Sequence, residues 1–280
     1  MQKGVIDFRL RPTTIKAVRP EFVREILRKM NIRSTESFEQ QSVPLLIGEM
    51  DAAGIEIGVI GSRTGTVKPG FDSTTNEDVA RLVAAYPGRF VGFGVVDSSD
   101  PATALEDIDR AAALGLVGIT IEPSQSRVRM TLDDRRIYQI YEKAQERGLA
   151  LFTAMSCLVG PYMEDTRPEL IDHVATDFPS LNIVIQHAGW PYVREAIGVA
   201  YKQPNVFLVP GQYLHYGFPG AQDLLTAANG ILADQMLYGS VYPICGSFVE
   251  LMRIVDALGL TDSAKHKYLQ GNARRLLKLP

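Results

Sequence analysis

The stretch Leu114-Gly115-Leu116-Val117-Gly118-Ile119-Thr120-Ile121 joins the end of a predicted helix to a short predicted strand. Gly115 fits the left-handed position that commonly follows the last residue of a helix. The run that follows is apolar almost throughout, as expected for a strand covered on both faces. The same junction recurs at Ala53-Gly54-Ile55 and Arg147-Gly148-Leu149, so the chain repeats a helix–strand unit.

Along the whole chain, short apolar runs alternate with longer segments of helical spacing. Eight runs are strand-like: Val5–Phe8, Ile57–Ile60, Phe90–Val95, Gly118–Ile121, Ala150–Thr153, Asn182–Gln186, Val206–Val209 and Met236–Tyr238. The helical segments include Asn76–Ala85, Ala102–Leu114, Asp133–Arg147, Pro168–Phe178 and Ser247–Leu258. Such alternation predicts a parallel sheet in an α/β protein. Eight strands favour a single-domain (β/α)8 TIM barrel over residues 1–280, with an open doubly wound sheet as the alternative.

Composition excludes several classes of protein. The chain has 280 residues, a net charge of −3 and a sequence pI of about 5.9, which argues against nucleic-acid or anionic-membrane partners. Two cysteines exclude a disulfide scaffold or a cysteine-rich zinc module. With neither a leader-like start nor a long apolar run, a soluble cytoplasmic protein is expected. No glycine-rich phosphate-binding motif follows a strand, so no nucleotide cofactor is expected.

The first strand ends in Asp7-Phe8-Arg9-Leu10-Arg11. Side chains alternate along a strand, so Asp7, Arg9 and Arg11 are expected on one face. Burying these charges is costly unless they are paired or contact a ligand. Two alternatives follow, which are a structural ion pair of Asp7 with an arginine and an anion site at the mouth of the barrel.

Active sites of this fold lie at the carboxyl ends of the strands. The polar residues at or just beyond these ends include Asp7, Arg9, Arg11, Arg63, Asp97, Glu122, Cys157, His187, Tyr213, His215 and Tyr242. So many polar groups at the ends of apolar runs point to function more than to structure.

Four segments together resemble the amidohydrolase-related family, in the branch that includes decarboxylases and lactonases. Ile6–Arg11 stands where that family has Ile-Asp-x-His-x-His, and Gln186–Pro191 resembles its strand-six signature. Leu237–Pro243 resembles its strand-eight signature, and Gly271–Leu277 its C-terminal one. The segments fall in the family's order and span nearly the whole chain, so the resemblance implies a TIM barrel.

The departures from the family pattern concern the metal. Typical members bind a divalent ion with two strand-one histidines, a strand-five histidine, a strand-six histidine and a strand-eight aspartate. Here the strand-one positions are Arg9 and Arg11, the strand-five position is near Thr153, and the strand-eight position is Val241. Arginine has no lone pair with which to bind a metal. Only His187 remains, so no catalytic metal and no other cofactor is expected.

Roles follow from residue chemistry. Arg9 and Arg11 suit a bidentate carboxylate clamp, to which Arg63 adds. His187, Glu122 and Asp7 are the candidates for proton transfer. Substrate contacts are expected from three further side chains, those of Tyr242, Trp190 and His215.

The resemblance and these residues favour a metal-independent hydrolase or lyase that acts on a small carboxylate or lactone by lactone hydrolysis, isomerisation or decarboxylation. The alternative is a non-catalytic relative that binds an anionic metabolite or a protein partner. A metal held by His187, His215 and Glu122 is a third reading that matches no ligand spacing. Family members often form oligomers, which implies a homo-oligomer here. The segment Arg19–Gln41, with an amphipathic helix at Pro20–Met30, is a candidate lid or subunit contact.

Overall fold

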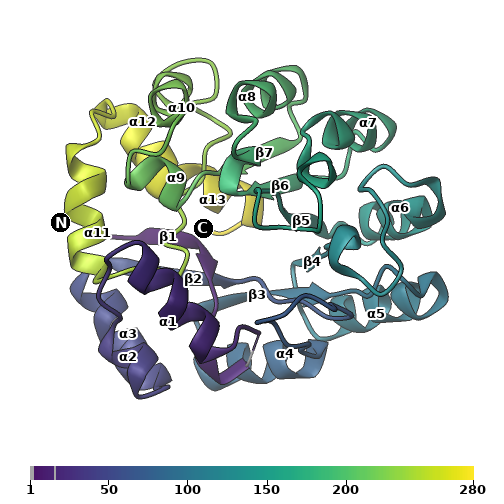
Figure 1. The fold of residues 1–280 in the computed structure, drawn as a ribbon, viewed down its shortest axis with the longest axis horizontal. Helices are drawn as coiled ribbons and strands as arrows, with labels where there is room; N and C mark the ends of the chain where they lie inside the picture. Colours follow the sequence, from purple (N-terminus) through teal and green to yellow (C-terminus); the bar gives the residue numbers. More distant parts are fainter. Residues whose placement is uncertain (1–2, 16) are drawn as a thin grey trace.

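Seven parallel strands follow one another around a nearly closed barrel in the computed structural model, which describes residues 3–15 and 17–280 (Figure 1). Each strand pairs with the next along the chain, in the order β1 to β7. Their bounds are β1 Val5–Leu10, β2 Ile55–Ile60, β3 Phe90–Val95, β4 Gly118–Thr120, β5 Ala150–Ala154, β6 Ile183–Gln186 and β7 Val206–Val209. The predicted TIM barrel is confirmed, and the open doubly wound sheet is not formed.

The segment predicted as an eighth strand closes the ring without forming a regular strand. Met236 bridges Leu208 of β7, and Leu237 N donates to Leu208 O over 2.9 Å. On the other side Phe8 N of β1 donates to Tyr238 O over 2.8 Å. Main-chain hydrogen bonds to both neighbours therefore complete the barrel.

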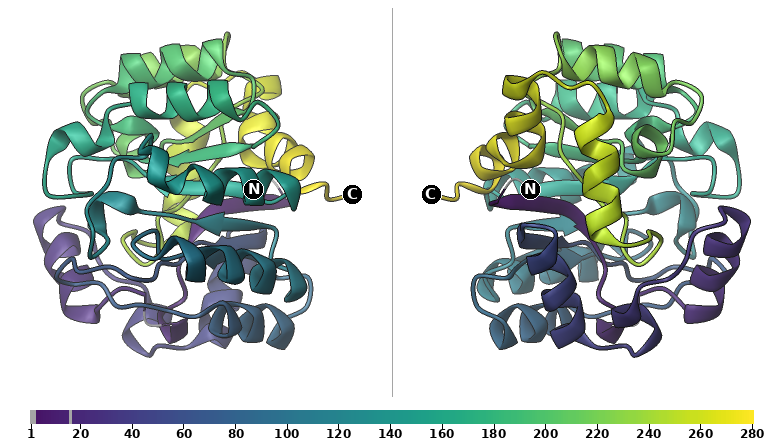
Figure 2. Two further views of the ribbon diagram at one scale, coloured as in Figure 1. Left: turned by 90° about the vertical axis from the view of Figure 1, so that its right-hand side faces the viewer. Right: turned by 90° about the vertical axis from the view of Figure 1, so that its left-hand side faces the viewer.

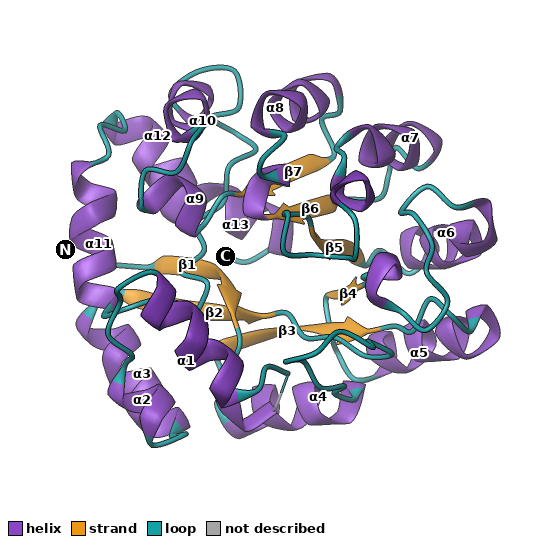
Figure 3. Ribbon diagram, in the orientation of Figure 1, coloured by secondary structure: helices purple, strands orange, loops and turns teal. Residues whose placement is uncertain are grey.

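Helices surround the strands (Figure 3). Their bounds are α1 Pro20–Lys29, α2 Glu36–Glu39, α3 Val43–Ala52, α4 Asn76–Ala85, α5 Pro101–Ala113, α6 Tyr138–Glu146, α7 Glu169–Asp177, α8 Val193–Lys202, α9 Gln212–His215, α10 Ala221–Ala228, α11 Phe248–Ala257, α12 Asp262–His266 and α13 Asn272–Leu277. The helix predicted from Asp133 begins as α6 only at Tyr138, because the Asp134 side chain caps a short 3-10 turn. Gly54, Gly115 and Gly148 have φ of +76°, +76° and +66°, which confirms the predicted helix ends.

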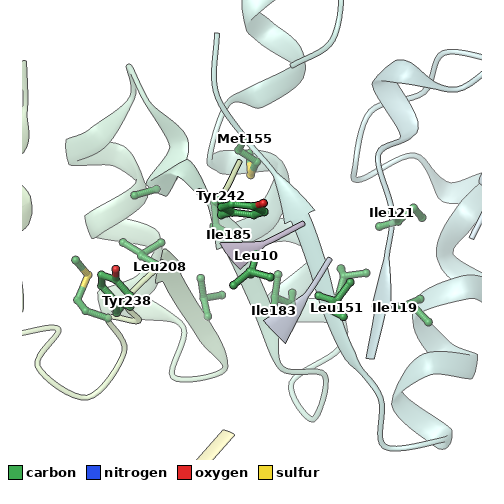
Figure 4. Packing of buried hydrophobic residues seen from close by; sticks show 14 of the residues in the cluster. Leu10, Ile119, Ile121, Leu151, Met155, Ile183, Ile185, Leu208, Tyr238 and Tyr242 are labelled. Carbon is green, nitrogen blue, oxygen red and sulfur yellow. The ribbon is translucent and has the colours of Figure 1, made fainter. Parts of the chain in front are cut away.

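Two apolar clusters hold the barrel together. The outer cluster lies between strands and helices and includes Leu10, Ile183 and Leu208 (Figure 4). The inner cluster takes alternate side chains from the strands, with Phe8, Phe93 and Phe152 packed edge to face or tilted. Three leucines at the end of the chain, Leu276, Leu277 and Leu279, pack against this inner cluster and close its floor. Figure 2 shows the C-terminus and helix α1 on opposite sides of the barrel. The mouth of a barrel of this fold lies at the carboxyl ends of the strands. Among the described residues, no helix is long and apolar enough to cross a membrane.

Strand β1 does not alternate regularly. Its pairing with β2 shifts between Asp7 and Leu10. Phe8 packs in the inner cluster, while the next residue, Arg9, also turns toward the mouth, where its guanidinium reaches His187. Leu10 then packs in the outer cluster. The expectation that Asp7 shares a face with the two arginines is therefore wrong, because the irregularity inserts an extra inward-facing residue.

Asp7 joins β1 to the closing segment. Its Oδ1 accepts from the backbone N–H groups of Arg9 at 3.0 Å and Ser240 at 2.9 Å. The carboxylate lies near two tyrosines of the outer cluster, Tyr238 and Tyr268, whose pKa values are raised by burial and then by Asp7. Burial raises the pKa of Asp7 itself to about 6, against the lowering effect of the Ser240 and Arg9 hydrogen bonds.

Asp7→Asn is expected to stabilise the protein above pH 6. The folded-state pKa lies above the ordinary value of 3.8, so wild-type stability falls as pH rises from about 4 to 6 and stays reduced above that range. Asparagine keeps the accepting oxygen but carries no charge. The free energy of unfolding at neutral pH should therefore rise by roughly 3 kcal/mol. Urea unfolding at pH 8 and pH 4 measures this, and the gain should vanish at pH 4. Exposed Asp262→Asn is the control, and a loss of stability for Asp7→Asn at pH 8 would contradict the expectation.

Candidate active site

A cavity of about 50 Å³ lies at the carboxyl ends of the strands. Its walls carry the polar side chains Arg9, Arg11, Arg63, Lys68, Gln125, Ser156, His187, Gln212 and Tyr213 together with the apolar Phe22, Ile26, Phe71, Ala154, Leu158, Val159, Val241 and Ile244. Four of the predicted site residues therefore meet at one place, namely the three arginines and His187.

The three arginines are held rigidly by the ends of the strands. Their exposed fractions are 6% for Arg9, 6% for Arg11 and 4% for Arg63. Arg11 Nε donates to Gly61 O over 2.7 Å, and its Nη2 lies 3.8 Å from Glu122 Oε1. Arg63 Nη1 lies 3.1 Å from Glu122 Oε2. One carboxylate thus offsets two guanidiniums, which accounts for the buried position of Glu122.

Several arginine donors lack partners among the described residues. These are Arg9 Nε and Nη1, Arg11 Nη2 and Arg63 Nε. Burial, followed by the charge of Arg63, lowers the pKa of Arg9 to about 9. Burial, Arg9 and Arg63 likewise hold the pKa of Arg11 well below its usual range. Buried donors without acceptors and a surplus of positive charge both indicate a place for an anion.

His187 follows β6 in the 3-10 turn η5 (His187–Gly189), where its φ is +68°. Arg9 Nη2 lies 3.0 Å from His187 Nε2. Arginine only donates, so Nε2 accepts and the ring proton of the neutral imidazole is on Nδ1. Nδ1 is buried without a partner in the described chain. Burial and then Arg9, Arg11 and Arg63 hold the His187 pKa well below its ordinary value.

Helix α1 covers the mouth, as proposed for the lid in the segment Arg19–Gln41. Phe22 and Ile26 of α1 line the cavity. Phe22 lies 4.9 Å from the ring of Phe71, and Arg19 pairs with Asp72 at 2.8 Å. These two contacts hold α1 against the loop after β2 at the edge of the cavity.

Five predicted site residues lie outside the cavity lining, and one of them, Glu122, contacts it through Arg11 and Arg63. Asp7 faces the outer cluster, as described above. Tyr242 Oη lies 3.0 Å from Ser37 Oγ, away from the mouth. His215 Nε2 lies 2.7 Å from Tyr268 Oη, and burial lowers its pKa to about 3. Trp190 lies behind the cavity wall, stacked on Tyr213 with the rings 4.8 Å apart.

Two polar residues of the cavity were not predicted from the sequence. Lys68 lies in the loop that follows β2 and Arg63, and Gln125 lies in the 3-10 turn η2 (Pro123–Gln125) after Glu122. Gln125 donates to Glu122 Oε2 over 2.9 Å and accepts from Arg63 Nη1 over 3.3 Å. Their positions a few residues beyond flagged strand ends are the only signal that could have identified them.

The residues at the family's metal positions do not fit a metal ion. Arg9 and Arg11 present only donors, and Ala154 and Val241 line the cavity where ligands of strands five and eight would stand. Within the described residues, no group of three His, Cys, Asp or Glu side chains is placed to hold an ion. The combination of His187, His215 and Glu122 is therefore not a metal site, since His215 is bonded to Tyr268.

Comparison with known proteins agrees with the barrel. A family model described as amidohydrolase matches residues 38–279, and the chain belongs to the amidohydrolase family, a family of enzymes. The structure of an uncharacterized TIM-barrel protein from Bordetella bronchiseptica is 36% identical, with a TM-score of 0.90 over 98% of both chains.

Two relatives have named activities. A 2-keto-4-carboxy-3-hexenedioate hydratase from Sphingobium sp. is 26% identical over an alignment of 237 residues, with coverage of 72% of this chain and 69% of that protein. A 2,6-dihydroxybenzoate decarboxylase complexed with 2,6-dihydroxybenzoate is 17% identical, with a TM-score of 0.73 over 99% of this chain and 100% of the other. The second likeness shows the fold alone.

Arg9→Met is expected to raise the pKa of His187 toward its ordinary value of 6.5, because Arg9 is the strongest of the charges that lower it. Wild-type His187 should be neutral at neutral pH, with its proton on Nδ1. Imidazole 15N chemical shifts measure both properties, and a His187→Gln spectrum assigns the signal among the four histidines. Lys68→Met, the weakest of these charges, should shift the pKa least. Titration of wild-type His187 near pH 6.5 would contradict this assignment.

Proposed function

We propose that this chain is a metal-independent hydrolase or lyase that acts on a small carboxylate or lactone substrate. The observation that carries the proposal is the cluster of Arg9, Arg11 and Arg63 around one cavity, with unpartnered donors in place of the family's metal ligands. The arginines bind the anion, and His187 transfers a proton as general acid or base. Lactone hydrolysis, isomerisation and decarboxylation are the reaction types under consideration.

The names of the relatives support this class. Hydratases and decarboxylases are lyases, and both named relatives have substrates that carry carboxylate groups. The named hydratase has a polycarboxylate substrate, which agrees with a site rich in buried arginine. A lyase that acts on a carboxylate is accordingly the branch of the proposal that we would assay first.

Binding of a carboxylate would remove the main electrostatic penalty of the site. Two oxygens of one carboxylate match the parallel N–H groups of a guanidinium. They would satisfy donors of Arg9 and Arg11 that lack partners in the described chain. Closure of α1, through Phe22 and Ile26, would exclude water and strengthen each of these interactions.

The same anion would prepare His187 for proton transfer. Without ligand, burial and the nearby cations keep its pKa well below the ordinary value. A bound carboxylate offsets these cations, so the His187 pKa rises. If Arg9 turns its guanidinium toward the substrate, Nε2 also becomes free to accept a proton. His187 is thus a base that gains strength when the substrate is in place, and Arg9 serves to bind and to position it.

The double variant Arg9→Met/Arg11→Met is expected to lose stabilisation by small carboxylates. For wild type, a carboxylate at a hundred times its Kd stabilises the fold by about 2.7 kcal/mol, which is several degrees in Tm. Differential scanning fluorimetry against mono-, di- and tricarboxylates and their lactones measures this. Lys29→Met, an exposed lysine paired with Glu25, is the matched control. Absence of stabilisation of wild type by every acid would refute the anion-clamp proposal.

Turnover of a substrate identified in this way is expected to survive a strong chelator. Conversely, His187→Gln should lower kcat by about 10²–10⁴-fold, the usual contribution of a general acid or base, with a smaller change in KM. Stopped assays with and without chelator measure both. Loss of activity on chelation with recovery on adding metal would disprove metal independence. Tight carboxylate binding without any product would instead identify a non-catalytic binding protein.

A further inference from the structure

We infer that the cavity is built for a substrate with two separate carboxylates, the first held by Arg9 beside His187 and the second by Arg63 and Lys68. This inference rests on the proposed function and names the class of its substrate. Its basis is the surplus of cations around the cavity, which come in two groups from the neighbouring strands β1 and β2, each with its own donors.

The first wall comes from β1, β6 and β7. Arg9 leaves β1 with Nε and Nη1 unpartnered in the described chain, and its Nη2 lies 3.0 Å from His187 Nε2 after β6. The Tyr213 ring from α9, which follows β7, lies 5.5 Å from the His187 ring, edge to face. This wall offers arginine donors beside the one histidine that faces the cavity.

The second wall comes from the segments after β2, the neighbour of β1, and after β4. Arg63 lies over the Phe71 ring, with its central carbon 3.9 Å from the ring centroid, and it is fixed by Glu122 and Gln125. The Lys68 ammonium lies 5.5 Å from the centroid of the same ring. Phe71 therefore places both cations side by side, with Arg63 Nε still unpartnered in the described part of the chain.

The charges of the two walls do not balance. Arg9, Arg11, Arg63 and Lys68 line the cavity, and Glu122 is the carboxylate that contacts Arg11 and Arg63. Of the other two carboxylates predicted at strand ends, Asp7 faces the outer cluster and Asp97 pairs with Arg127 outside the cavity lining. Lys68 forms no ion pair with a carboxylate of residues 3–15 or 17–280. A monocarboxylate would leave at least two cations of a buried site without a counter-charge, whereas a dicarboxylate compensates both walls.

A substitution of Lys68 allows the second subsite to be tested separately from the first. It is partly exposed and contributes only weakly to the environment of His187. Its removal should therefore affect the second carboxylate and leave the first subsite intact. Arg63 is less suitable for this purpose, because it contacts Glu122, which in turn contacts Arg11.

Isothermal titration calorimetry with matched acids tests the inference. Benzoate is compared with benzene-1,3-dicarboxylate, and butyrate with glutarate, at constant ionic strength and neutral pH. Wild type should bind the dicarboxylate of at least one pair about tenfold or more tightly than its monocarboxylate, a difference of about 1.4 kcal/mol. Lys68→Met should abolish this preference while the monocarboxylate Kd stays within about twofold, the scale of ordinary surface substitutions. Lys29→Met should retain the preference.

The outcomes separate this inference from the proposed function. Equal binding of mono- and dicarboxylates by wild type, lost in Arg9→Met, would overturn the two-carboxylate inference and support the carboxylate site. No binding of any acid would overturn both. An unchanged dicarboxylate preference in Lys68→Met would overturn the assignment of the second subsite. Inorganic phosphate serves as a compact dianion, and binding as tight as that of the best dicarboxylate would overturn the requirement for two separate groups.

Discussion

Uncompensated positive charge inside the mouth of the barrel is the constraint on which the rest of this site depends. Three arginines are buried there, each with an exposed fraction of 6% or less. Glu122 offsets only part of their charge. Such an arrangement is costly in the absence of a counter-ion, and it persists because strand ends and Phe71 hold the side chains in place. Charge that the fold does not neutralise is available to bind a substrate.

Two features of the barrel position this site, namely the register shift in β1 and the segment that closes the ring. The shift in β1 between Asp7 and Leu10 turns Arg9 to the mouth while Phe8 still fills the barrel interior. Asp7 precedes the shift and points outward by ordinary alternation between Ile6 and Phe8, and it links β1 to Ser240 in the segment that closes the ring. One residue of the opening motif thus joins the first and last segments of the barrel, and the next polar one faces the cavity.

Much of this could be predicted from the sequence, and the exceptions have physical causes. Apolar runs and glycine helix ends located the seven strands, and the strand-end rule identified Arg9, Arg11, Arg63 and His187, all of which line the cavity. Periodicity could not reveal the irregularity in β1, because it depends on pairing with β2. The positions of Tyr242 and His215 depend on tertiary partners, Ser37 and Tyr268, from distant parts of the chain. Lys68 lies in a loop whose course no local pattern specifies.

Replacing a metal by arginines changes which group controls reactivity. A metal ion lowers the pKa of bound water and so supplies its own base. Arginine supplies only a positive charge and hydrogen-bond donors. In the proposed mechanism proton transfer then falls to His187, whose pKa is lowered by burial and by the arginines that would bind the anion. A monocarboxylate would offset part of that charge, and a dicarboxylate more of it, so the basicity of His187 would increase with the charge of the ligand. In such a site the recognition of the substrate and the activation of the base are one electrostatic event, and a ligand of too little charge would bind without reacting.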